Sequence, residues 1–287
     1  MIKDIHNYKL HLDPKARGIQ SWLRGWRQGT PDREPAFEHI IRQEVKPGMA
    51  VFELGANVGY LTFMMWTLLK GEGEVFAIEP DPRNFKYLKE SVSLNKAGDI
   101  VQVFPYAIDN KDGDVTFYLG TKSNLSSIKP TKNTTDETVT VKTFTIDTLF
   151  KDRNFPNFIK MDIEGHEVEA LEGSLETFSN QFPCKILIEV HPQFLEEPKR
   201  FEDIIRELLK LGFNYRFVVS AAVAVPDKFR EKGYTPKQVF PGGWPRGLYD
   251  NITNDDAIYL SCYPHKQDCG HKGISPKICR SVMLERK

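Results

Sequence analysis

The chain has few cysteines, no excess of charge and no long apolar run, and each absence excludes a class of protein. Only four cysteines occur in 287 residues, three of them after position 260, which is not the distribution of a secreted disulfide framework. Basic and acidic residues number 39 each, so there is no global positive field for nucleic acid. No stretch has the length of a membrane span or the apolar core of a signal peptide. We therefore expect a soluble, cytoplasmic protein whose partner is neither a membrane nor a nucleic acid; its oligomeric state is open.

Short apolar runs alternate with helical patterns along most of the chain. The predicted strands are 49–54, 74–78, 101–106, 158–162, 185–190, 213–219 and 257–262. Helical patterns cover 58–69, 82–95, 166–178 and 200–211. Such alternation predicts an α/β fold with a doubly wound, mainly parallel, seven-stranded sheet.

Four segments fall outside this alternation. Residues 1–48 are expected to form an N-terminal helical cover, because apolar residues recur at helical spacing from Ile19 to Val45. The main domain, 49–262, carries insertions at about 107–145 and 220–255, the first predicted to hold an antiparallel strand pair at 113–119 and 138–144. Residues 263–287 are expected to be a C-terminal tail.

A glycine turn stands between the first strand and the following helix. Gly55 and Gly59 are spaced as G-x-x-x-G, and the dinucleotide fingerprint G-x-G-x-x-G is absent. Gly55 permits close approach of the backbone to a ligand, and a helix starting near Val58 would offer N–H groups to an anion. Glu53 precedes the glycines and suits an ammonium group. The pattern favours a cofactor with an amino-acid moiety over a pyrophosphate.

The second strand ends at Glu79, which lies 20 residues after Gly59. A carboxylate at this place can accept hydrogen bonds from both ribose hydroxyls, although an acid before a helix can also be a simple cap. The glycine turn and the acid together favour cofactor binding.

Acidic and histidine side chains also follow the fourth and fifth strands. Asp162 ends the fourth strand, whereas Glu164 and Glu167 suit the first turn of the next helix. Glu189 and His191 end the fifth strand. A histidine there can be a general base or a hydrogen-bonded structural residue. Asp162 is the other candidate base, and a divalent metal held by Asp162 with Glu189 or His191 is a further alternative.

Four ordered motifs resemble the FkbM family of methyltransferases over roughly residues 34–260. They are 52–60 (FELGANVGY), 77–82 (AIEPDP), 160–167 (KMDIEGHE) with 171–173 (LEG), and 188–191 (IEVH). The family usually has Asp where Glu53 stands, which keeps the carboxylate, and a small residue where His166 stands.

The resemblance implies a class I, Rossmann-like fold that transfers methyl from S-adenosylmethionine, usually to an oxygen of a sugar or another small metabolite. It implies that the cofactor is bound by the glycine-turn motif and by the acid motif of the second strand, with Asp162 near the reacting centre. These cofactor residues are Glu53, Gly55, Ala56, Asn57, Gly59, Tyr60, Glu79 and Pro80, with Ala107 and Ile108 beside the adenine.

Two other function classes stay open from the sequence. A nicotinamide-dependent oxidoreductase uses the same fold, although the missing fingerprint counts against it. A non-catalytic module that binds nucleotide or nucleic acid is the second, with a modest basic bias after residue 263 in its favour.

The insertion at 220–254 is expected to form a lid over a small-molecule or glycan acceptor. Trp244 and Tyr249 offer flat apolar faces, and Arg246 offers a donor fork for hydroxyls or an acidic group. The alternative is that these residues pack on the core.

The three cysteines nearest the C-terminal end, together with one histidine, suggest a zinc site. Cys262, Cys269, His271 and Cys279 have the residue types of a Cys₃His zinc site, but the spacing lacks the usual close cysteine pairs. Unpaired reduced cysteines are the favoured interpretation.

Overall fold

The computed structural model describes residues 1–151 and 153–287, with the backbone only at His271, and its contacts divide the chain into two units. Unit 1 comprises Met1–Asp32 and Ile41–Thr177. Unit 2 comprises Arg33–Ile40 and Phe178–Lys287. No helix in the described ranges is both long and apolar enough to cross a membrane.

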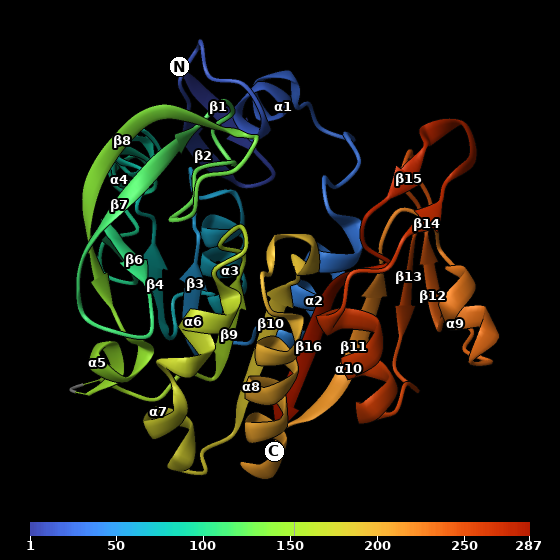
Figure 1. Cartoon of the computed structure of the whole chain (residues 1–287). Coiled ribbons are helices and arrows are strands. Elements are labelled where there is room, and N and C mark those ends of the chain that lie inside the picture. Colours follow the sequence, from blue (N-terminus) through green and yellow to red (C-terminus); the bar gives the residue numbers. More distant parts are fainter. Residues whose placement is uncertain (152) are drawn as a thin grey trace. The chain divides into compact units, whose positions relative to one another are not determined.

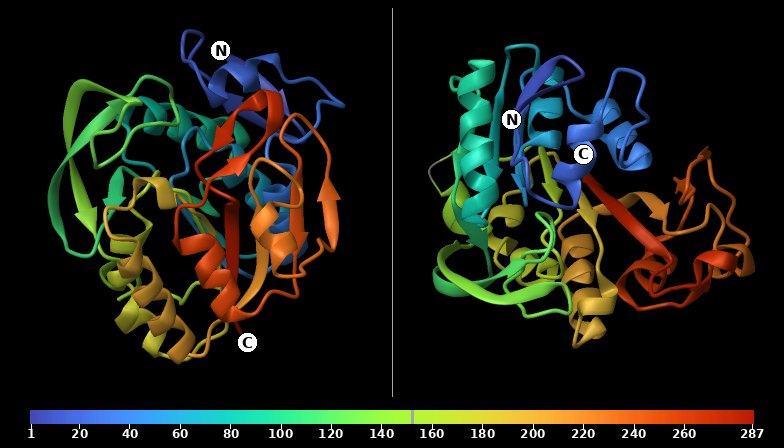
Figure 2. Two further views of the ribbon diagram at one scale, coloured as in Figure 1. Left: turned by 45° about the vertical axis from the view of Figure 1, so that its right-hand side comes forward. Right: turned by 90° about the horizontal axis from the view of Figure 1, so that it is seen from above.

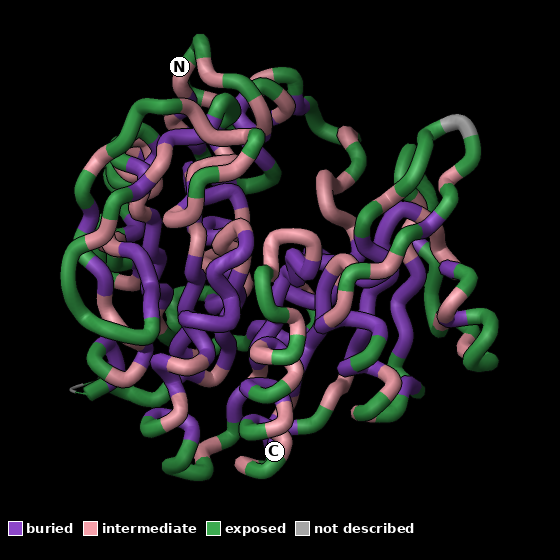
Figure 3. The backbone as a smooth tube through the Cα atoms, viewed as in Figure 1, coloured by how far each residue is buried: buried purple, intermediate pink, exposed green. Residues whose placement is uncertain are grey.

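Four parallel strands form the sheet of unit 1. They are β3 (Ala50–Leu54), β4 (Glu74–Ile78), β5 (Val101–Phe104) and β9 (Phe158–Met161), in the order β9-β3-β4-β5. Figure 1 labels β9, β3 and β4. Every residue of β3 and β9 is buried, and both strands run purple in Figure 3. Strands buried on both faces are typical of a parallel sheet covered by helices. The predicted α/β fold with a parallel sheet is confirmed here.

Helices connect these parallel strands. α3 (Tyr60–Leu69) joins β3 to β4, and α4 (Pro82–Asn95) joins β4 to β5. The Asp81 side chain caps α4 by accepting from the N–H of Arg83, and Pro82 occupies the first turn. The helix predicted at 166–178 is two short helices, α6 (Glu167–Glu172) and α7 (Leu175–Ser179). They separate at Gly173, where a Cβ would lie 2.5 Å from the carbonyl oxygen of Asp109.

A three-stranded sheet carries the first insertion. The strands β6 (Tyr106–Ile108), β7 (Gly113–Gly120) and β8 (Thr134–Phe144) are ordered β6-β8-β7, and β7 pairs antiparallel with β8. The predicted antiparallel pair is confirmed, and both strands are longer than expected. α5 (Ile146–Phe150) follows β8.

The N-terminal segment is only partly helical. A hairpin of β1 (Ile2–Ile5) and β2 (Tyr8–His11) precedes α1 (Ile19–Gly25) and α2 (Pro35–Glu44). The hairpin is tied to α4, since Asn95 Oδ1 accepts from the N–H of Lys9 at 2.8 Å and Ser91 Oγ accepts from the N–H of His11 at 2.8 Å. The prediction of a helical cover over residues 1–48 is therefore wrong for residues 2–11, which form this hairpin.

Unit 2 contains an antiparallel sheet of five strands in the order β12-β13-β11-β16-β10. The strands are β10 (Cys184–Glu189), β11 (Asn214–Ser220), β12 (Gln238–Phe240), β13 (Arg246–Tyr249) and β16 (Cys279–Arg286). β16, the long red arrow of Figure 2, pairs with both β10 and β11. The segment expected to be a tail thus supplies a central strand, along with the small pair β14 (Gln267–Asp268) and β15 (Ile274–Ser275) and the short 3-10 helix Gly270–Lys272.

Helices of unit 2 include α8 (Pro198–Lys210), α9 (Asp227–Glu231) and α10 (Asn254–Cys262), with a 3-10 turn at Pro192–Phe194. The strand predicted at 257–262 is wrong, because that segment is α10. Thr253 caps the helix by accepting from the N–H of Asp256, and Asp255 and Asp256 suit its first turn.

Candidate functional site

The glycine turn after β3 is held by backbone contacts. Gly55 has φ 82°, and a Cβ there would lie 2.0 Å from the carbonyl oxygen of Asp162. The N–H groups of Gly55 and Ala56 both donate to the carbonyl of Ile78, at 3.0 and 2.9 Å. Only glycine fits this position, because its backbone is left-handed and the neighbouring strand end is too close.

Asn57 connects the turn to the end of β4 and to the first insertion. Its backbone N–H donates to Glu79 Oε2 at 2.7 Å, and its Nδ2 donates to the carbonyl of Ser123 at 2.6 Å. Its Oδ1 accepts from the N–H of Val58 at 2.9 Å. Its φ of 53° is one that asparagine tolerates better than most residues. Asn57 therefore organises the predicted cofactor site.

The helix after the turn begins at Tyr60, two residues later than the sequence suggests. The N–H of Gly59 donates to the carbonyl of Ala56 at 2.9 Å, which ends the turn before the helix starts. Gly59 has φ 91°, and a Cβ there would lie 2.8 Å from Leu88 Cδ1. Tyr60 is 4% exposed and lies among core residues. Gly59 thus permits α3 to pack closely against α4.

Glu53 is buried beneath the turn. It is 1% exposed, and its carboxylate accepts a hydrogen bond from the Thr62 hydroxyl and lies 3.4 Å from Lys160 Nζ. Lys160 Nζ also donates to the carbonyl of Gly55 at 2.9 Å. Burial raises the pKa of Glu53, and the charge of Lys160 partly offsets that effect. A direct contact between Glu53 and the cofactor stays a prediction; the observed contacts give it a role in supporting Gly55.

Glu79 follows β4 and faces the turn. Its Oε2 accepts from the N–H of Asn57 and its Oε1 accepts from the N–H of Asp81 at 2.9 Å. Burial, followed by the charge of Asp81, raises the pKa of Glu79 to about 8. A carboxylate has about four acceptor positions, so these contacts leave capacity for ribose hydroxyls. Pro80 beside it is partly exposed.

Ala107 and Ile108 lie on β6 and are 4% and 3% exposed. The next residue, Asp109, accepts a hydrogen bond from His166 Nε2 at its Oδ1, at 3.0 Å. His166 Nδ1 lies 3.5 Å from Glu169 Oε2. Although burial opposes it, contact with His166 lowers the pKa of both carboxyls. His166, whose role the sequence left open, thus ties the segment after β6 to α6.

Ser123, in the first insertion, is a site residue that the sequence analysis missed. Its carbonyl accepts from the Nδ2 groups of Asn57 and Asn84, at 2.6 Å each. Its N–H and hydroxyl both donate to the carbonyl of Arg17, at 3.3 and 2.8 Å. A polar loop gives no sequence signal for such contacts, because they use a backbone carbonyl that every residue has.

These contacts fit the expected cofactor in two respects. The glycine turn brings the backbone close to the end of β9, and Glu79 retains acceptor capacity for a ribose. The residues that would hold S-adenosylmethionine in unit 1 are Gly55, Ala56, Asn57 and Glu79, with Ala107 and Ile108 near the base.

Asp162, directly after β9, is partly buried, and its N–H donates to the carbonyl of Leu54 at 3.1 Å. Asp162 and Glu164 each offer a carboxylate oxygen, and these atoms lie within 4.8 Å of one another. Glu164 has φ 54°, which turns the chain sharply at this point. Two carboxylates this close suit a hard divalent cation, and a metal held by Asp162 stays a prediction.

Glu189 and His191, after β10 in unit 2, form a hydrogen-bonded pair. His191 Nε2 lies 3.1 Å from Glu189 Oε1, and its ring stacks on Phe194 with centroids 5.8 Å apart. Glu189 Oε1 is also 2.5 Å from Arg280 Nη1 and 3.5 Å from Lys277 Nζ. Although burial opposes it, these cations and His191 hold the pKa of Glu189 well below its usual value. Glu189 is therefore an ionised partner for His191 and a poor base itself.

The second insertion contains a hairpin of β12 and β13. Trp244, near its tip, is 50% exposed and has Lys272 Nζ 4.8 Å from its ring centroid. Arg246 begins β13 and is partly buried. Tyr249 is 0% exposed, and its hydroxyl donates to the carbonyl of Ala224 at 2.7 Å. The structure thus places Tyr249 in the interior, whereas Trp244 is exposed and Arg246 is partly exposed; a contact of these two residues with the acceptor stays a prediction.

The three cysteines near the C-terminal end, Cys262, Cys269 and Cys279, are free thiols. Cys262 and Cys279 are buried, and burial raises the pKa of both thiols, that of Cys262 to about 12. Among the side chains that the structure describes, no cluster of three metal-ligand residues includes Cys262, Cys269 or Cys279. The fourth proposed ligand, the His271 side chain, lies outside the described residues.

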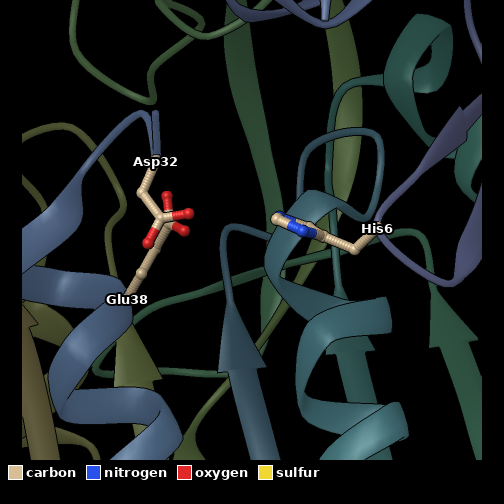
Figure 4. A group of neighbouring side chains, drawn as sticks. All are labelled: His6, Asp32 and Glu38. Carbon is tan, nitrogen blue, oxygen red and sulfur yellow. The ribbon is translucent and has the colours of Figure 1, made fainter. Parts of the chain in front are cut away.

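His6 and Asp32 in unit 1 also offer ligand atoms within 4.8 Å of each other (Figure 4). The Asp32 carboxylate is already held in a two-point ion pair by Arg42, with N–O distances of 2.6 and 3.2 Å. Partial burial and the positive charge of Arg42 lower the pKa of His6, against the opposing effect of Asp32. The pair with Arg42 accounts for this arrangement without a metal.

Comparison with known proteins places these residues in context. The model of the Methyltransferase FkbM domain matches residues 53–215, from the glycine turn to β11. The hexuronic acid methyltransferase AglP of Haloferax volcanii is 26% identical over 225 residues, which cover 76% of this chain and 87% of that protein.

Solved structures resemble the chain more distantly. The methyltransferase FkbM of Methylobacillus flagellatus has 19% identity and a TM-score of 0.38, and the match covers 54% of this chain and 40% of that one. A SAM-dependent O-methyltransferase of Thermotoga maritima has 11% identity and a TM-score of 0.45, with 93% and 70% covered.

Proposed function

The chain belongs to the FkbM family of S-adenosylmethionine-dependent methyltransferases, with the class I α/β fold, and we therefore propose that it methylates a hydroxyl oxygen of a sugar, a glycan or another small metabolite. Family membership decides against the nicotinamide-dependent oxidoreductase. Support for a sugar acceptor comes from the relative whose name is hexuronic acid methyltransferase.

His191, held by an ionised carboxylate, is the observation that carries the proposal of an oxygen acceptor. S-adenosylmethionine supplies a methyl group on a sulfonium, which is activated for in-line displacement. A sugar hydroxyl is a weak nucleophile, so it must give up its proton as the new bond forms. We assign this proton to His191, and Glu189, 3.1 Å away, orients the ring and stabilises its protonated form.

Glu189 itself is held in place by the basic residues around it. Arg280 and Lys277 contact its Oε1, and Lys277 Nζ donates to the carbonyl of Val190 at 2.8 Å. A carboxylate fixed in this way cannot rotate freely, so it fixes the His191 ring as well. The binding energy of the acceptor is then used to position the reacting hydroxyl.

Asp162 and Glu164 support a second candidate, metal-assisted activation of the acceptor. Their carboxylate oxygens lie within 4.8 Å of one another, which is close enough for both to bind one hard divalent cation. Removal of metal with EDTA separates the two candidates. Activity that survives EDTA and depends on His191 supports the base, whereas activity restored only by Mg²⁺ or Mn²⁺ supports the metal.

The experiment that tests the proposed function uses labelled S-adenosylmethionine. The full chain is incubated with a panel of mono- and oligosaccharides, with small phenols and RNA as controls. We expect label in a sugar ether that resists mild alkali, unlike a methyl ester. Transfer only to RNA or to a phenol would contradict the sugar assignment. A thermal shift with S-adenosylhomocysteine but not with NAD is expected for the same preparation.

A further inference from the structure

Arg246 is a partly buried arginine that lacks a counter-ion within unit 2. Its guanidinium makes no hydrogen bond and no salt bridge to any residue that the structure describes. Burial is the main cause that lowers the pKa of Arg246, and the nearby Arg280 adds to it. Taking a guanidinium partly out of water without a partner costs free energy, and a ligand that brings an anionic partner would offset that cost.

The two carboxylates whose charges raise the pKa of Arg246 are already paired with other residues. Glu189 lies 2.5 Å from Arg280 Nη1 and 3.5 Å from Lys277 Nζ. Glu34 lies 3.1 Å from Arg280 Nη2. The negative charges of both acids raise the pKa of Arg246 without direct contact. Neither therefore neutralises Arg246 by direct contact.

Charges of both signs act on Arg246. Burial and the charge of Arg280 lower its pKa, whereas Glu34 and Glu189 raise it. An anionic group of a ligand would supply the direct contact that neither acid makes. Arginine presents parallel N–H donors that match the two oxygens of a carboxylate.

We infer that Arg246 binds a carboxylate group of the acceptor, so that the enzyme acts on an acidic sugar. This inference rests on the proposed function, because it names the substrate class of the same site. Trp244 lies two residues before Arg246 and has an exposed aromatic ring, a surface on which a sugar ring can pack. Arg246 is thus a specificity-determining residue, and His191 remains the proposed base.

The test compares two sugars that differ only in the charged group. Methyl glucuronide carries a carboxylate where methyl glucoside carries a hydroxymethyl group. Binding of each to the full chain saturated with S-adenosylhomocysteine is measured by calorimetry or ligand-observed NMR. We expect the wild type to bind the glucuronide at least tenfold more tightly than the glucoside, as a charge-assisted two-point contact implies.

Three variants identify the residue responsible. Arg246→Met should remove the preference, and Arg246→Lys should keep part of it, because the charge stays and the fork is lost. Arg230→Met is the matched control, since Arg230 is an exposed arginine of unit 2 paired with Asp227, and it should retain the full preference. Melting temperatures establish that all three variants are folded.

The outcomes separate this inference from the proposed function. Equal binding of the two sugars, or a preference that survives Arg246→Met, overturns the carboxylate site even if a neutral sugar is methylated. Tighter binding of glucose 6-phosphate overturns the carboxylate in favour of a phosphate. Glucuronide binding that depends on Arg246 supports the inference even if no sugar on the panel accepts methyl, a result that would count against the proposed function alone.

Discussion

Glu79 should make cofactor binding depend on pH, and the size of the effect follows from its surroundings. Its pKa is raised to about 8 by burial and by Asp81. Roughly one molecule in ten therefore carries the ionised carboxylate at pH 7, and roughly nine in ten carry it at pH 9. If ribose hydroxyls donate to the ionised form, the apparent Kd should fall about tenfold between these pH values, because only the ionised fraction is competent.

The assay uses a ligand without the amino-acid part. An α-amino group titrates near pH 8, so S-adenosylhomocysteine would add its own pH dependence. 5′-Methylthioadenosine keeps the adenine and the ribose and lacks that group. Its Kd is measured by calorimetry from pH 6 to 9.5 for the wild type, for Glu79→Gln and for the control Glu74→Gln, which changes a carboxyl at the opposite end of β4.

The wild type and the control should show the tenfold change, and Glu79→Gln should bind weakly at every pH. The loss is expected to be about 1.5–3 kcal/mol, since a hydrogen bond to a charged acceptor is replaced by one to an amide. The reasoning is refuted by a wild-type Kd that does not vary with pH, or by a Glu79→Gln protein that keeps the wild-type slope.

The same raised pKa bears on stability with the opposite sign. The folded state holds the Glu79 proton more tightly than the unfolded chain, whose pKa is near 4.5. This group's contribution to the free energy of unfolding is therefore fully present below about pH 4.5 and is lost as the pH rises through 8.

Three further predictions concern single residues. His191→Ala should lower kcat by roughly 10²–10⁴-fold and leave the Kd of S-adenosylhomocysteine near wild type, because general-base help acts on the chemical step; His265→Ala is the control. Trp244→Ala should abolish most acceptor use without a shift in Tm, since the ring is 50% exposed; a large drop in Tm would favour the packing alternative. Gly55→Ala should lower Tm by several degrees and weaken cofactor binding, because the added Cβ would meet the carbonyl oxygen of Asp162; a wild-type Tm and Kd would contradict the assigned strain.

The part of the fold that the sequence predicts well is the part whose signals are local. The strands before Gly55 and Glu79 are short apolar runs bounded by turn residues, and they appear as β3 and β4. The antiparallel pair of the first insertion was predicted from alternation, which is also a local pattern. The glycine turn and the acid after β4 could be located for the same reason, since they keep a fixed spacing, and their contact with the cofactor stays a prediction.

The prediction for the C-terminal part of the chain was wrong because an apolar run alone does not distinguish a helix from a strand. Residues 257–262 are apolar enough for a strand, but Thr253 with Asp255 and Asp256 is the start signal of a helix. The N-terminal hairpin shows the reverse case. Tyr8 and Leu10 alternate with exposed residues, a strand pattern that the helical interpretation of 1–48 overlooked.

The contacts within the site were harder to predict because they join distant segments. Nothing in the sequence pairs Ser123 with Asn57 or His166 with Asp109. The ion pair of Glu189 with Arg280 was equally hard to predict, because the segment that forms β16 was expected to be a tail. Residue types at strand ends indicate chemistry, whereas the neighbours that determine protonation become known only with the fold.

The position of β16 has a consequence for how unit 2 folds. This strand lies between β10 and β11, and Cys184 pairs with Arg286 across most of the sequence of the unit. The sheet therefore cannot close until a distant segment arrives, which makes folding slow, and until then β10 and β11 have edges open to other chains. Arg280 lies on the same strand, so the ion pair that orders Glu189 and His191 forms only when this sheet is complete. A change that weakens the pairing of β16 should therefore disturb the proposed base as well as the sheet.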